Sequence, residues 1–175
     1  CARSIACSCA SAKKAHSMSS AETDQAAAQA MAEGLLLGAH RFHVYKGKGT
    51  DERKHDIKSV RVVESELRRV RLMEEGIALG TLLAQATMLA RDLVNTPSAD
   101  MAPIRLAEAA KACAVRGSGI SCKILDQKTM ERLGMGAALA VARGSAHPPV
   151  GVHLTYKPKR SKKTVAVVGK AVTFD

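Results

Sequence analysis

The last eleven residues of the chain, VAVVGKAVTFD, carry the two side chains best suited to metal chemistry. Lys170 and Asp175 lie five residues apart, just beyond a short apolar run. A carboxylate is a hard metal ligand, and a lysine can bind a metal as a neutral amine. A free lysine titrates at about pH 10.4, so it donates a lone pair only where burial and adjacent cations lower that value. Spacing alone favours a simpler interpretation, in which Lys170 is exposed at a strand end and Asp175 is a turn or cap residue.

A strand at Val165–Val168 must position these candidate ligands. The run is short, rich in valine and closed by Gly169, which is typical of a buried strand. Such a strand places the residues that follow it beyond its carboxyl end. We therefore expect a buried strand that delivers Lys170 and then Asp175 to one site.

Three segments show the apolar period of helices. The first begins at a capping box formed by Ser19 and Glu22 and runs to about Ala39. The second, Ser65–Asn95, is predicted to be about 40 Å long. The third begins with Pro103 as its first helical residue. The second helix is long enough to connect two domains, although an ordinary core helix would show the same pattern.

Short strands are expected around these helices. Alternating apolar residues predict strands at Ile120–Ile124 and Val150–Tyr156. Asp126 is placed to cap a brief helix, QKTMERLG, and the small residues that follow, AALAVAR, predict a further strand. Val60–Val63 and part of HRFHVYK predict two more before the long helix. The elements from about Ser98 onward therefore predict an α/β domain with a mixed central sheet flanked by helices.

Composition and charge narrow the class of protein. Hydrophobic residues make up 46% of the chain, as in globular proteins, and the net charge is +11. Charged residues interrupt each apolar stretch before it reaches the ~20 residues of a membrane span, so no membrane is expected. Eight lysines and arginines but no acid occur from Arg132 to Phe174. Nucleic acid is not the expected partner, because this charge joins no binding motif and because half of a domain would show the same imbalance.

Two common functional motifs are absent from the sequence. A phosphate-binding loop would need glycine and then Ser or Thr where the chain has Thr164 and Ala171. Ser145 and His147 are too close in sequence for a catalytic pair, and no GxSxG motif surrounds the serine.

Cysteine and histidine spacing predicts no zinc site. The five cysteines form no pair of CxxC motifs, and Cys113 and Cys122 are expected to be small buried thiols. His40, His43 and His55 have no carboxylate or cysteine at ligand spacing, so solvated histidines are expected.

Four segments of the chain are informative when taken in their order and spacing: AEGLLLGAHRFHVYK, ARDLVNTPSADMAP, LGMGAALAVARGSAHPP and VAVVGKAVTFD. Together they resemble the leucyl aminopeptidase (cytosol aminopeptidase) family. The resemblance covers nearly everything from about Ala32 onward, and its most specific piece is the closing GKAVTFD. The family usually has glycine in place of Ala171, which is a one-carbon departure beside a ligand. Spacing alone favours an exposed Lys170 and a turn or cap role for Asp175. The resemblance instead favours metal ligands at both positions.

This resemblance implies a site with two divalent cations per subunit, commonly zinc or manganese, with magnesium or cobalt as alternatives. Lys170 matches a ligand of one cation, and Asp175 matches the aspartate that contacts both. The remaining acidic ligands, a second lysine that polarises the carbonyl group and an arginine that holds a bicarbonate base would follow residue 175. No catalytic residue is therefore expected within the chain. The family assembles as a homohexamer.

The resemblance also implies a domain organisation. Residues 20–64 would be the end of an N-terminal α/β domain, residues 65–95 the interdomain helix, and residues 96–175 the first part of a catalytic domain that is truncated. Residues 1–19 are expected to be a disordered extension or a transit-like segment. The expected compartment is the cytoplasm, or a plastid or other organelle if residues 1–21, which contain no acid, are a transit segment.

We therefore expect a metalloprotease that hydrolyses peptides by releasing N-terminal amino acids, with leucine-like residues preferred. The isolated chain is expected to be inactive, because it holds two candidate ligands where a dinuclear site needs about five or six. Two alternatives remain. The chain could be a non-catalytic module that binds nucleic acid through its basic surface at residues 132–170, or a fragment of a pseudo-enzyme.

Overall fold

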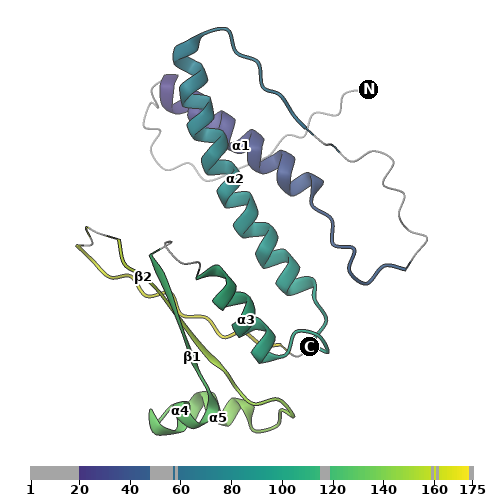
Figure 1. Ribbon diagram of the computed structural model, residues 1–175, viewed down its shortest axis with the longest axis vertical. Helices are drawn as coiled ribbons and strands as arrows, with labels where there is room; N and C mark the ends of the chain where they lie inside the picture. The colour runs from purple at the N-terminus through teal and green to yellow at the C-terminus, as the bar shows by residue number, and fades with distance from the viewer. Residues whose placement is uncertain are drawn as a thin grey trace, which may run out of the picture. The chain divides into compact units, whose positions relative to one another are not determined.

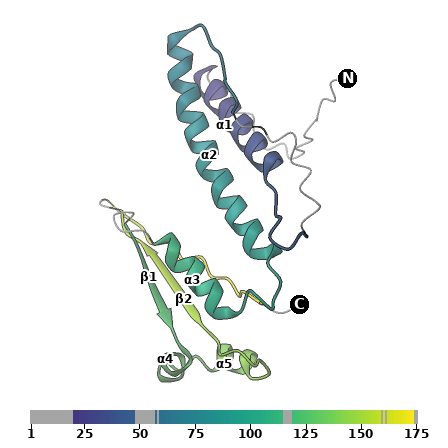
Figure 2. The same cartoon turned by 45° about the vertical axis from the view of Figure 1, so that its right-hand side comes forward.

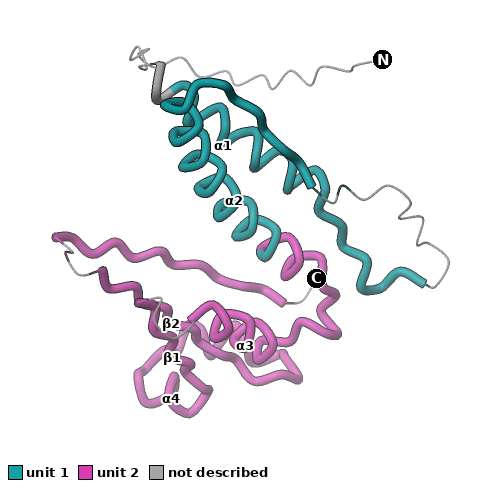
Figure 3. Tube along the Cα trace, turned by 45° about the horizontal axis from the view of Figure 1, so that its top comes forward, with its two compact units in different colours: residues 1–89 teal, residues 90–175 magenta. Residues whose placement is uncertain are grey.

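The computed structural model describes residues 20–47, 57, 59–114, 119–158, 160 and 162–173, with the side chains of residues 20–22 left out (Figure 1). Several predictions lie outside these residues: the extension at residues 1–19, the Ser19–Glu22 capping box, His55 and Asp175. The chain divides into two compact units, residues 1–89 and residues 90–175 (Figure 3). Each unit is described by itself.

Two helices make up most of the described part of the first unit. Helix α1 spans Ser20–Ala39, and helix α2 spans Leu67–Asn95, running on into the second unit. Figures 1 and 2 both show α1 beside the first part of α2. The helices predicted to end near Ala39 and Asn95 are therefore confirmed, as is the length of the second, at 29 residues.

Glycines on α2 let the two helices approach closely. Gly76 and Gly80 are buried, and a Cβ atom built on either would overlap the carbonyl oxygen of Gln25 or Gln29 on α1. The same added atoms would lie 3.1 Å from the Cβ atoms of Ala28 and Ala32, respectively. Backbone therefore packs directly against backbone here, and only glycine fits at these two positions of α2.

An arginine joins α1 to the start of α2. The Arg69 guanidinium donates two hydrogen bonds of 2.9 Å to the carboxylate of Asp24, and its Nη1 lies 3.2 Å from Glu64. The hydrogen bonds from Arg69 lower the pKa of Asp24. The pKa of Glu64 is lowered first by hydrogen bonds from the backbone N–H groups of Glu66 and Ser65, and further by the charge of Arg69. The network therefore ties together segments 45 residues apart.

Helix α2 is long and apolar enough, by length and composition alone, to cross a membrane. Its most apolar 18-residue window has a mean hydropathy of 1.3, and 11% of that window is buried. This finding stands against the expectation that charged residues interrupt every candidate span. Core helices of soluble proteins pass the same criteria, and α2 uses one face to pack against α1. A single such helix is therefore weak evidence for a membrane.

The second unit is an α/β fragment. Strands β1 (Ile120–Leu125) and β2 (Gly151–Tyr156) form an antiparallel pair in which Ile120 lies opposite Tyr156 and Leu125 opposite Gly151. Helix α3 (Pro103–Cys113) packs against both strands, as Figures 1 and 2 show. Two short helices, α4 (Gln127–Arg132) and α5 (Gly136–Ala142), lie between the strands in sequence. The predictions of α3, with Pro103 in its first turn, and of both strands are confirmed.

The strand predicted at Val165–Val168 is wrong. These residues belong to no strand, and Val165, Val167 and Val168 have exposed fractions of 84%, 94% and 93%. The physical reason is the lack of a partner, because the sheet of the described residues contains only β1 and β2, and neither pairs with this segment. Burial on both faces requires neighbouring strands and covering helices.

Three further strand predictions are also wrong. The segment AALAVAR is mostly helix α5, since alanine and leucine are strong helix formers and alanine is depleted in strands. Val60–Val63 has no strand partner and is exposed at Val63. HRFHVYK instead contains a turn at Val44–Tyr45, in which the Lys46 N–H donates to the His43 carbonyl.

The core of the described residues is small. Its buried hydrophobic residues are five alanines and one methionine, and none of the larger side chains is fully buried. Cys113 is exposed and Cys122 is half-buried, so the expectation of buried thiols is wrong for Cys113. Helix packing therefore rests on close backbone contact rather than on large side chains. The buried residues are Ala28, Ala32, Ala84, Ala102, Ala107 and Met130.

The close approach predicts opposite effects for two glycine substitutions. Gly80→Ala should lower the free energy of unfolding by at least about 1 kcal/mol, because the added methyl group meets the α1 backbone. Gly34→Ala on α1 should raise it by about 0.5–1 kcal/mol, because nothing lies within 4 Å of the added atom and alanine favours helix. Urea unfolding followed by circular dichroism measures both. A stabilising Gly80→Ala would contradict the packing.

The Arg69 network predicts a change in acid stability. Because the pKa of Asp24 is lowered in the folded state, its stabilisation is present above the unfolded pKa of about 4 and is lost as pH falls through the folded value. Arg69→Met should return the pKa of Asp24 towards its ordinary value and remove that contribution. NMR titration of the carboxyl carbon and unfolding between neutral and acidic pH measure the effect.

The control for this prediction is Arg71→Met. Arg71 pairs with Glu75 on the exposed surface of α2 at 3.4 Å, and its side chain is 84% exposed. This substitution should leave the acid-unfolding profile unchanged. The network has no role in stability if Arg69→Met and Arg71→Met unfold alike at every pH.

Candidate functional site

Of the two candidate metal ligands, the structure describes only Lys170. Lys170 is exposed and lies in an extended segment outside any helix or strand. Asp175 lies outside the described residues. The structure therefore does not test whether the two side chains meet, and their pairing stays a prediction.

The described residues do not by themselves form a metal centre. Within residues 20–47, 57, 59–114, 119–158, 160 and 162–173, no group of three or more His, Cys, Asp or Glu side chains could hold a metal ion. A divalent metal needs about four to six donors, and one exposed lysine supplies one at most. A metal site at Lys170 thus requires ligands from beyond the described part of the chain.

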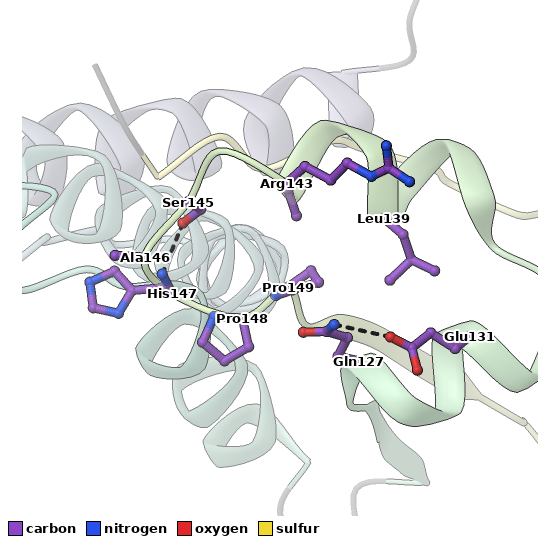
Figure 4. A pocket seen from close by; sticks show the side chains of 10 residues that line it. Gln127, Glu131, Leu139, Arg143, Ser145, Ala146, His147, Pro148 and Pro149 are labelled. Carbon is purple, nitrogen blue, oxygen red and sulfur yellow. Dashed lines mark hydrogen bonds between the residues drawn. The ribbon is translucent and has the colours of Figure 1, made fainter.

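A cavity of about 580 Å³ lies in the second unit, between α4, α5 and the loop at residues 145–149. Figure 4 shows that the His147 ring and the Arg143 guanidinium lie on opposite sides of it. Gln127 donates a hydrogen bond of 3.0 Å to Glu131 on the remaining wall. The two basic groups therefore do not converge in this cavity. Its lining residues are Gln127, Glu131, Leu139, Ala142, Arg143, Ser145, Ala146, His147, Pro148 and Pro149.

The side chain of Ser145 bonds to the backbone of the loop that forms one wall of this cavity. Its Oγ accepts a hydrogen bond of 3.1 Å from the backbone N–H of His147 (Figure 4). The hydrogen bond thus ties Ser145 to the backbone two residues further on, and the expectation that Ser145 and His147 form no catalytic pair stays a prediction.

Asp126 fixes the helix that forms the other wall. Its carboxylate accepts a hydrogen bond of 2.9 Å from the Thr129 N–H and caps α4, as predicted. Hydrogen bonds from Thr129, followed by the nearby charges of Arg132 and Lys128, lower the pKa of Asp126. The cap thereby holds Gln127 and Glu131, one turn apart on α4, at the edge of the cavity.

The sequence analysis did not predict the cavity or the Asp24–Arg69 ion pair. The cavity walls on α4 carry an ordinary glutamine and glutamate four residues apart, which gives no signal of a cavity. The Asp24–Arg69 pair joins residues 45 positions apart, and any arginine on α2 would have looked equally available. Only a three-dimensional contact identifies either feature.

A comparison with protein families matches the second unit. The model described as "Cytosol aminopeptidase family, catalytic domain" matches residues 88–175. The match starts within α2 and includes the cavity, both strands and the segment that carries Lys170.

Individual relatives extend the likeness over most of the chain. A "Probable cytosol aminopeptidase" of Aquifex aeolicus (strain VF5) is 44% identical over 148 residues, and one of Persephonella marina (strain DSM 14350 / EX-H1) is 38% identical over 154 residues. A third, from Sulfurihydrogenibium sp. (strain YO3AOP1), is 43% identical over 147 residues. These alignments cover 84%, 88% and 84% of the chain but 28%, 30% and 28% of the relatives. The chain thus spans less than a third of their length.

The Asp126 cap predicts a local effect on the cavity. Asp126→Ala should increase amide hydrogen exchange in Gln127–Arg132, because the Thr129 N–H loses its acceptor and the helix end frays. Asp126→Asn should preserve most of the protection, since asparagine also caps helices. Exchange measured by mass spectrometry tests both variants. Equal protection in the parent and in Asp126→Ala would show that the cap does not hold this wall.

Proposed function

The chain belongs to the cytosol aminopeptidase family, and from this premise we propose that it is part of a metal-dependent exopeptidase. The reaction is hydrolysis of the first peptide bond of a peptide, with release of the N-terminal amino acid and a preference for leucine-like residues. The single observation that supports this most directly is the catalytic-domain match over residues 88–175, which ends on GKAVTFD. The activity belongs to the longer protein, since the relatives are more than three times as long as the aligned part.

In this proposal Lys170 and Asp175 are metal ligands. Asp175 would bridge two divalent ions, zinc or manganese, and Lys170 would bind one of them as a neutral amine. Two adjacent ions can activate a water and stabilise the charge that develops on the reacting carbonyl group. A bridging carboxylate offsets the repulsion between two such ions. The remaining ligands and a bicarbonate base would come from sequence beyond residue 175.

The proposed organisation follows the same family. Residues 20–64 would close an N-terminal domain, residues 65–95 would connect the domains, and residues 96–175 would begin the catalytic domain with its mixed sheet. The longer protein would form a homohexamer in the cytoplasm, or in an organelle if residues 1–21 are a transit segment. The continuous helix α2, which belongs to both compact units, is compatible with a connecting role.

The first prediction concerns the 175-residue chain alone. It should neither hydrolyse a leucyl amide nor bind two Mn²⁺ or Zn²⁺ ions tightly, because it supplies two of the five or six ligands that a dinuclear site needs. Calorimetric titration with each metal and a chromogenic leucine substrate measure these properties. Stoichiometric binding of two ions, or turnover above a buffer control, would contradict the proposed assignment of the missing ligands.

The second prediction concerns the longer protein that contains this sequence. Lys170→Met and Asp175→Asn should each lower kcat/KM by on the order of a hundredfold or more, because a metal ion supplies several kcal/mol of transition-state stabilisation and each 1.4 kcal/mol is tenfold. Lys128→Met, at an exposed lysine on α4, is the matched control and should leave kcat/KM unchanged.

The metal content of Lys170→Met shows whether a loss of activity comes from the loss of a metal ligand. If Lys170→Met loses activity together with metal, its role as a ligand is supported. Full activity and full metal content in this variant would remove Lys170 from the site. A parent protein that binds no metal and hydrolyses no peptide would instead support the pseudo-enzyme.

A further inference from the structure

We draw no further inference here: the strongest candidate, the cavity between α4, α5 and the loop at residues 145–149, has exposed polar side chains whose two basic groups do not converge, and nothing in the structure shows what covers it.

Discussion

The proposed metal site at Lys170 would need a fixed backbone at Val165–Val168, such as strand pairing would supply. A lysine side chain has four rotatable carbons, so a fixed backbone is needed to hold its amine at coordination distance. In the described chain this segment is extended but unpaired, and its valines are exposed. The same lack of neighbours therefore accounts for an open valine surface and for an exposed Lys170. Lys170 therefore lies in a segment that has no strand partner among the described residues.

The first unit is organised by a different constraint, which is close backbone contact. Gly76 and Gly80 remove the side chains that would separate α2 from α1, and Arg69 fixes the register by pairing with Asp24. This packing uses one face of α2 and leaves leucines such as Leu82, with an exposed fraction of 63%, without cover. Helix α2 thus packs against α1 on one face and exposes apolar side chains on another.

The sequence predicted elements whose signals are local. Helical periodicity identified α1, α2 and α3, and alternation identified β1 and β2. Pro103 and Asp126 marked helix starts correctly, since both act through their own backbone or side chain. Strands that depend on distant neighbours were predicted poorly, because Val60–Val63 and Val165–Val168 have the right composition but no partner. The family resemblance found the candidate ligands, whereas spacing alone favoured an exposed lysine.

The central claim is that Lys170 and Asp175 bind the same pair of metal ions in the longer protein. Anomalous diffraction from crystals of that protein soaked in Mn²⁺ tests it most directly, because the metal positions are measured independently of activity. The account predicts two manganese peaks per subunit, with the Lys170 Nζ about 2–2.5 Å from one and Asp175 oxygens at similar distances from both. Manganese peaks far from Lys170 and Asp175, with the lysine still exposed to solvent, would contradict it.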